Sequence, residues 1–106
     1  MISIEDVQKL GLRIGTIKVA EGVDSSEKLL QLTIDLGDEQ RQLVAGIAKS
    51  YQPSELINKQ VIVVSELAPR TIMGVESNGM ILCANGEAGP VLLSPIASVT
   101  AGATVQ

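Results

Sequence analysis

Residues 30–47 read LQLTIDLGDEQRQLVAGI, and this stretch predicts a β-hairpin. Apolar residues occupy every second position of its first half, as is typical of a strand with one buried face: Leu30, Leu32, Ile34 and Leu36. The glycine and acidic residues at 37–39 supply a turn. Residues 41–47 then return with apolar side chains on one face, so two antiparallel strands are expected.

Outward from this hairpin, three further segments are expected to form strands: residues 10–21, 61–65 and 80–84. Gly15 lies inside the first of them, where a bulge or sharp bend is the ordinary reason for a glycine. Residues 53–57 predict a short helix, because Pro53 suits a first turn and Glu55 suits the positive end of the helix dipole. Asn58 follows where a left-handed residue ends a helix.

Five strands with a helix between the third and the fourth are the order of the OB-fold, a Greek-key barrel with a ligand-binding groove. We therefore predict an all-β, five-stranded OB-fold barrel over residues 4–90, entered through a helical turn at 4–9. Residues 91–106 form a C-terminal extension with alternating apolar side chains. Such an extension must wrap the barrel or meet a partner, and we expect a dimer contact there. The whole chain, 1–106, is then one domain.

The composition argues against most enzyme classes. The chain has 106 residues, no histidine and one aromatic residue, Tyr51. Histidine is absent, so catalytic triads, imidazole acid–base catalysis and histidine metal sites are excluded, and we expect no catalytic residue, metal or cofactor. Its single cysteine, Cys83, stands in the apolar sequence Met80-Ile81-Leu82-Cys83-Ala84 and is expected to be a reduced, buried thiol.

Neither a signal sequence nor a membrane segment is expected. Glu5 and Asp6 stand where a signal peptide needs basic residues, and no apolar run approaches the roughly 18 residues that a membrane span needs. A soluble, cytoplasmic protein without a membrane partner is therefore predicted. Eight Lys and Arg against twelve Asp and Glu give a net charge of −4, so general attraction to polyanions is not expected either.

Three stretches carry a family resemblance: LGLRIGTIKVAEGVDSSEKLLQLTIDLGDEQRQLVAGIAK, SYQPSELINKQVIVV and ELAPRTIMGVESNGMIL. They resemble the tRNA-binding domain found at the C-terminus of methionyl-tRNA synthetases and in freestanding dimeric tRNA-binding proteins. The resemblance spans residues 4–105. It implies a homodimeric OB-fold that binds tRNA by shape, without catalysis, and assists aminoacylation by a methionyl-tRNA synthetase catalytic domain.

The matched motifs contain the candidate RNA-binding residues: Lys28, Arg41, Lys49, Arg70, Ser77, Asn78 and Met80. Lys9, Lys18 and Lys59 are interpreted as solvated surface residues. Gly74 and Gly79 are expected to serve the backbone conformation. With one aromatic residue in the chain, stacking of bases on aromatic platforms is excluded as the binding mode, which leaves phosphates, 2′-hydroxyls and helical shape.

Two other functions fit the same residues. Small dimeric relatives of this fold act as export-related chaperones, and a groove around Ile72 and Met80 could hold an apolar peptide. The apolar alternation of the C-terminal extension also fits a dimerisation domain of a longer synthetase chain. Suppression of the aggregation of an unfolded client protein would identify the chaperone function. The oligomeric state of the chain tests the dimerisation function.

Overall fold

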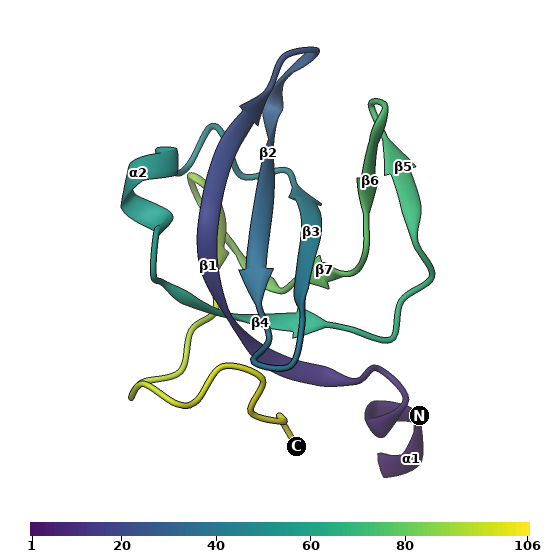
Figure 1. Cartoon of the computed structure of the whole chain (residues 1–106). Coiled ribbons are helices and arrows are strands. Elements are labelled where there is room, and N and C mark those ends of the chain that lie inside the picture. The colour runs from purple at the N-terminus through teal and green to yellow at the C-terminus, as the bar shows by residue number, and fades with distance from the viewer.

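The computed structural model describes residues 1–106 and is built around one long curved strand, β1 (Leu12–Val23). Its second half pairs with β2 (Ser26–Asp35) and its first half with β4 (Gln60–Val64), both antiparallel. Adding β3 (Gln40–Ala45) and β7 (Met80–Ile81) gives one five-stranded sheet in the order β3-β2-β1-β4-β7 (Figure 1). The predicted hairpin and the all-β fold class are confirmed.

The sheet curls around a core of aliphatic side chains. The apolar positions of the opening hairpin are its centre: Leu30, Leu32, Ile34, Leu36 and Leu43 are each at most 2% exposed. Strands β1 and β4 complete the core from the other side with Ile17, Val61 and Val63. The radius of gyration is 13.4 Å, as expected for about 100 compact residues.

Both predicted helices are present. Helix α1 (Ile4–Gln8) begins with a capping box in which the Ser3 and Asp6 side chains satisfy each other's backbone amides. Helix α2 (Pro53–Leu56) lies between β3 and β4 and buries Leu56 against the core. Asn58 takes the expected left-handed conformation, with φ of 67°.

The predicted fifth strand, residues 80–84, does not run as one element. The Leu82 N–H still donates to Ile62 of β4, but the Leu82 carbonyl accepts from Leu93 instead. The chain thus changes partners at Leu82, and β8 (Cys83–Gly86) forms a separate hairpin with β9 (Gly89–Leu92). The glycine-containing segment 85–89 forms the turn of this hairpin.

A further hairpin stands beside β3 that the sequence did not reveal (Figure 1). It consists of β5 (Arg70–Ile72) and β6 (Val75–Ser77), joined by Met73 and Gly74. Both turn residues have positive φ, 51° and 79°, as a two-residue hairpin turn requires. The expected conformational role of Gly74 is confirmed, as is that of Gly79 with φ of 131°.

Close packing, and not a bulge, is the reason for a glycine at position 15 in β1. A Cβ atom at Gly15 would lie 2.3 Å from Cγ2 of Ile34, so only glycine lets β1 approach β2 this closely. The pairing of β1 with β2 is irregular at two other places: at Lys18, between Ile17 and Val19, where the register shifts by one residue, and between Gly22 and Val23.

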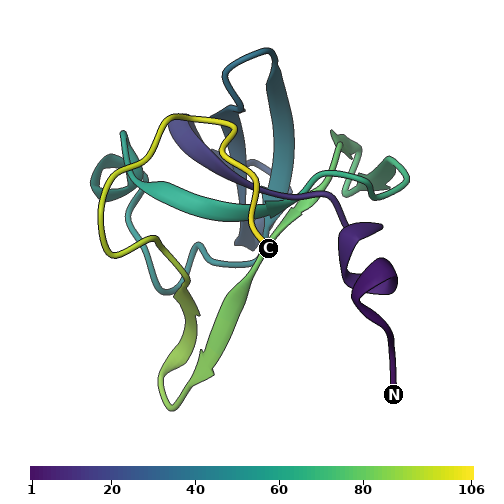
Figure 2. The ribbon, with the colours of Figure 1, turned by 90° about the horizontal axis from the view of Figure 1, so that it is seen from below.

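The C-terminal extension wraps the barrel and still exposes apolar side chains. Its end runs along β1, where Ile14 exchanges hydrogen bonds with Gly102 and Ala103 at 2.7 and 2.8 Å (Figure 2). Before that contact, four apolar residues remain 37–108% exposed: Val91, Leu93, Ile96 and Val99. The extension therefore closes one side of the barrel and presents an apolar strip to the outside.

Candidate functional site

The eight basic side chains differ in whether the fold already provides a partner. Four donate to groups within the protein: Lys9, Arg13, Lys18 and Arg41. The other four make no side-chain hydrogen bond or ion pair and are exposed: Lys28, Lys49, Lys59 and Arg70. Three of these four are candidate RNA-binding residues, whereas Arg41 is engaged.

Arg70 and Met80 line one apolar pocket of about 310 Å³. We call it the seam pocket, because it lies where β3 and β7, the two edges of the sheet, face each other. Leu29, residues 44–47, Ile72, Ile81, Cys83 and Pro90 complete its lining.

Lys28 and Lys49 lie on chain segments that flank the seam pocket but do not line it; Lys49 lines a separate pocket with Tyr51 and Glu87. Lys28 directly precedes Leu29, and Lys49 follows two residues after Ile47, both of which line the seam pocket. The Ala48 N–H donates to the Lys28 carbonyl at 3.1 Å, so the loop that carries Lys49 runs beside the start of β2. We call Lys28, Lys49 and Arg70, the three exposed candidate cations without a partner in the fold, the free-cation cluster.

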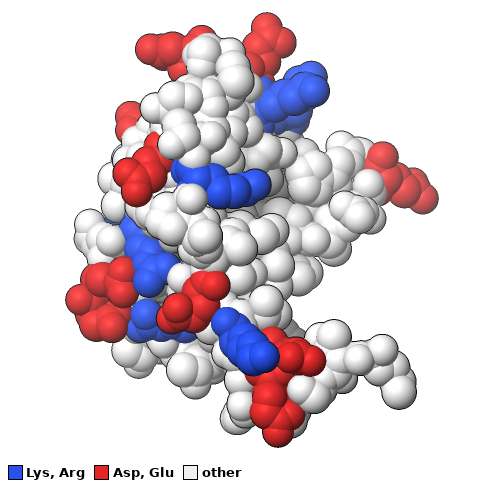
Figure 3. Space-filling view, turned by 90° about the vertical axis from the view of Figure 1, so that its right-hand side faces the viewer, with Lys and Arg blue, Asp and Glu red and all other residues white.

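The seam pocket differs in charge from the other surface pockets. Arg70 is its only charged residue, whereas four others each contain at least one carboxylate: Glu55, Glu39 with Glu66, Glu21 with Asp24, and Glu87. On the face seen in Figure 3, Lys and Arg side chains stand apart among acidic ones, with uncharged surface between them. A polyanion would therefore meet separate cations and not a continuous basic patch.

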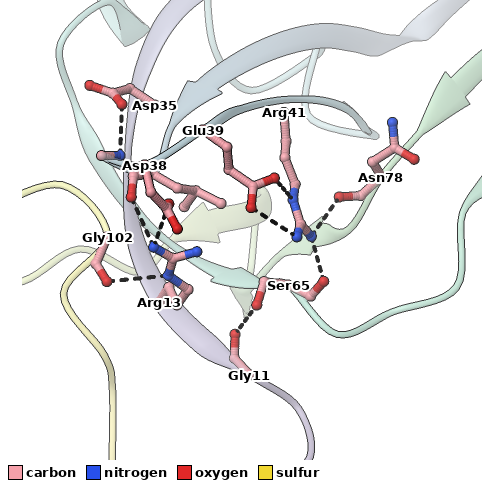
Figure 4. A network of polar contacts seen from close by, with 11 residues as sticks. Gly11, Arg13, Asp35, Asp38, Glu39, Arg41, Ser65, Asn78 and Gly102 are labelled. Atoms are coloured by element: carbon pink, nitrogen blue, oxygen red, sulfur yellow. Dashed lines mark hydrogen bonds and ion pairs between the residues drawn. The ribbon is translucent and has the colours of Figure 1, made fainter.

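Arg41 and Asn78 belong to an internal network (Figure 4). The Arg41 guanidinium pairs with the Glu39 carboxylate at 2.7 Å and also donates to the carbonyls of Ser65 and Asn78. The hydrogen bond between the two side chains holds the pKa of Glu39 below its ordinary value and raises the pKa of Arg41. Arg41 ties the β3 edge to the end of β4, and a phosphate would have to compete with Glu39 for it.

Ser77, one of the candidate RNA-binding residues, is buried. It is 1% exposed, and its Oγ accepts from the Val44 N–H at 3.0 Å and donates to the Gly79 carbonyl at 3.1 Å. The hydroxyl thus fastens β6 to β3 and is fully used. We correct the expectation for this residue: its role is structural.

Several residues at this surface escaped the sequence analysis. Gln31 donates to Gln42, and Gln42 donates to the Glu76 carbonyl, which places a row of amides between β2 and the β5–β6 hairpin. Gly46 lines the seam pocket, and Met73 is 56% exposed at the hairpin tip. All of them lie within the stretches that carry the family resemblance, but their mutual placement depends on the pairing of distant strands.

The single aromatic side chain is used for packing. The Tyr51 hydroxyl accepts a hydrogen bond from the Leu92 N–H at 3.0 Å, and the side chain packs against the core. Tyr51 is not among the residues of the seam pocket. The seam pocket therefore contains no aromatic platform, whereas Tyr51 lines a separate pocket together with Lys49.

Cys83 is half-buried, and burial raises the pKa of its thiol. The expectation of a fully buried thiol is thus too strong, because the β8–β9 hairpin leaves one side of Cys83 facing the seam pocket. No group of three or more metal-binding side chains lies together in the structure. Neither helix has the length or the apolar character to span a membrane.

Comparison with known sequences gives a family. Residues 12–104 match the family described as "Putative tRNA binding domain". The chain is 54% identical over 104 residues to a methionine–tRNA ligase of Archaeoglobus fulgidus, a match that covers 98% of this chain and 16% of the ligase. The chain thus spans about one sixth of the length of the curated relatives it matches.

Comparison with solved structures gives the same fold. A MetRS-related protein from Pyrococcus horikoshii superposes with a TM-score of 0.92 at 36% identity, covering 100% of this chain and 98% of that one. The chaperone CsaA from Bacillus anthracis superposes with a TM-score of 0.90 at 31% identity, covering 100% and 99%. Both coverages are nearly complete, so the hairpins and the C-terminal extension belong to the shared architecture.

Proposed function

Because the chain belongs to the tRNA-binding domain family, we propose that it is a non-catalytic module that binds tRNA by shape and assists aminoacylation by a methionyl-tRNA synthetase in the cytoplasm. The observation that carries this proposal is the family match over residues 12–104. Recognition by phosphate and 2′-hydroxyl contacts fits a surface with free cations and amides and a seam pocket without an aromatic side chain.

The free-cation cluster is the proposed contact for RNA phosphates. Lys28, Lys49 and Arg70 are exposed and free of carboxylate partners, so a phosphate displaces only water and counterions from them. Met80 lines the adjoining pocket. Arg41 and Asn78 take a secondary place in the proposal, since Arg41 must release Glu39 before it can contact a phosphate.

A homodimer is part of the same proposal. The exposed apolar strip of the extension suits a self-complementary contact between two copies. A dimer presents two free-cation clusters to one tRNA, which compensates for the net charge of −4 per chain.

A binding titration tests the site with a matched control. The cluster variant has alanine in place of Lys28, Lys49 and Arg70. The control variant has alanine in place of Lys9, Lys18 and Lys59, so both variants lose three positive charges. With a fluorescent tRNA at low salt, we expect the cluster variant to bind at least about tenfold more weakly and the control nearly as wild type. Equal affinities of the two variants contradict the assignment.

The assisting role has its own test. The chain is fused to the catalytic part of a methionyl-tRNA synthetase, with or without the cluster substitutions. Since a tethered module raises the local tRNA concentration, the intact fusion should have a lower KM for tRNA at unchanged kcat. A change in kcat alone contradicts the proposal.

A second candidate function is binding of unfolded polypeptide. The likeness to the chaperone CsaA and the apolar seam pocket favour it. The two functions separate in a direct comparison: suppression of client aggregation together with undetectable tRNA binding reverses our assignment.

A further inference from the structure

The seam pocket lies at the one place where the barrel wall has no hydrogen-bond ladder. Strands β3 and β7 are the edges of the five-stranded sheet, and they do not pair with each other. Near them, the Asn78 N–H donates to the Gln42 carbonyl at 2.9 Å. Gly46, just after β3, makes no hydrogen bond through its N–H or its carbonyl, so one donor and one acceptor are available beside the pocket.

The pocket combines an apolar interior with a single cationic group. Most of its lining is aliphatic, and its volume of about 310 Å³ is at the lower end for small-ligand sites. Arg70 contributes a guanidinium without a carboxylate partner and is the only charged residue of the lining. Charge complementarity therefore selects an anionic ligand that has a flat or apolar part.

We propose that the seam pocket receives one unpaired nucleobase of the bound RNA, whose neighbouring phosphate lies on Arg70. The aliphatic walls, from Leu29, Ile72 and Met80, cover the faces of the base, and the free N–H and carbonyl of Gly46 meet its edge. This inference rests on the proposed function and refines it. In addition to recognising the shape of the tRNA, the protein would bind one unstacked nucleotide in this pocket. An apolar pocket thereby replaces the missing aromatic platform.

Cys83 provides a native reporter, because it lines the pocket and is the only cysteine. Its alkylation by iodoacetamide is followed at alkaline pH, free and with saturating RNA. A tRNA transcript should slow the alkylation about tenfold or more, since an inserted base blocks the thiol. A blunt, fully paired RNA duplex, bound to the same saturation, should leave the rate nearly unchanged because it has no base to insert.

Two glycine substitutions give a matched pair. Gly46→Leu puts a side chain at the pocket, and Gly22→Leu puts one near the end of β1. Neither glycine has a positive φ, and a Cβ atom added at either position would have no atom within 4 Å, so both variants should fold. We expect Gly46→Leu to bind tRNA about tenfold more weakly, to lose the tRNA-dependent protection and to keep its duplex affinity. Gly22→Leu should keep the protection.

The outcomes separate the two levels of the proposal. If tRNA binds but leaves the alkylation rate of Cys83 unchanged, or if Gly46→Leu behaves as wild type, the nucleobase pocket is wrong and the tRNA-binding function stands. If tRNA does not bind at all, both are wrong. If an acidic, leucine-containing peptide protects Cys83 and tRNA does not, the pocket binds polypeptide and the nucleobase assignment is overturned.

Discussion

At the scale of single residues, the partner that the fold provides decides what a polar side chain can do. Lys28, Arg41 and Arg70 look equivalent in the sequence, yet Arg41 is held by Glu39 and two carbonyls while the other two are free. These partners come from the adjoining turn and from segments up to 37 residues away. Sequence reasoning therefore identified the candidate cations but could not tell the free ones from the engaged one.

Ser77 gives a prediction at this scale. Ser77→Ala removes the acceptor of the buried Val44 N–H, so the free energy of unfolding should fall by about 1–3 kcal/mol. The tRNA affinity of the folded variant should stay at the wild-type value, since the hydroxyl is buried. Denaturant unfolding and a tRNA titration measure the two effects, with Ser98→Ala at an exposed serine as the control. Lost affinity at wild-type stability contradicts the structural role.

At the scale of elements, local patterns predicted the long strands well and the short ones poorly. The alternation in residues 30–47 predicted β2 and β3 because alternate apolar side chains of this stretch, Leu30, Leu32, Ile34 and Leu43 among them, are buried in the core. The β5–β6 hairpin has three residues per strand, too few for any period to emerge. Likewise, the division between β7 and β8 depends on the hydrogen bond between Leu82 and the distant Leu93. Pairing with distant partners, and not local propensity, sets these elements.

Close packing of β1 on β2 makes a prediction about two glycines of the same strand. Gly15→Ala forces a Cβ to within 2.3 Å of Ile34 and should lower the free energy of unfolding by about 1–3 kcal/mol. Gly22→Ala, with open space around its Cβ, should change it by less than about 1 kcal/mol. Denaturant unfolding of both variants provides the comparison. A similar loss of unfolding free energy in both variants would show that contact with Ile34 is not the reason for the glycine at position 15.

The contact between the C-terminal extension and the β2–β3 turn makes a prediction about pH. Arg13 donates to the carbonyls of Gly102 and Leu36 and to the Asp38 carboxylate, as Figure 4 shows. The hydrogen bond from Arg13 lowers the pKa of Asp38 below its ordinary value of 3.8. This ion pair therefore stabilises the fold above that value, and the contribution disappears as the pH falls through the lowered pKa.

The free energy of unfolding of the Asp38→Asn variant, compared with that of wild type over a range of pH, measures this contribution. The variant should be less stable than wild type at neutral pH, and the difference should vanish in strong acid. The sign follows from the lowered pKa: the unfolded chain binds a proton at higher pH than the folded chain does. A difference that stays constant with pH would mean that the ion pair does not contribute.

At the scale of the whole molecule, the exposed apolar strip predicts self-association. Ile96 is fully exposed and Leu93 is 37% exposed on the same extension. If two copies meet there, Leu93→Asp with Ile96→Asp should turn a dimer into a monomer in sedimentation at micromolar concentration. Sedimentation of the wild-type chain as a monomer under the same conditions would contradict the dimer.

The charge distribution makes the most direct prediction of all. A chain with net charge −4 binds RNA only if a few free cations each neutralise a phosphate, and each such contact adds about 0.7–0.9 to the slope of log affinity against log salt concentration. The decisive measurement is that slope for a tRNA, in wild type and in the variant with alanine at Lys28, Lys49 and Arg70. We predict that the slope falls by about 2–3 in this variant and not when Lys9, Lys18 and Lys59 are replaced. The same slope in all three proteins would contradict the account.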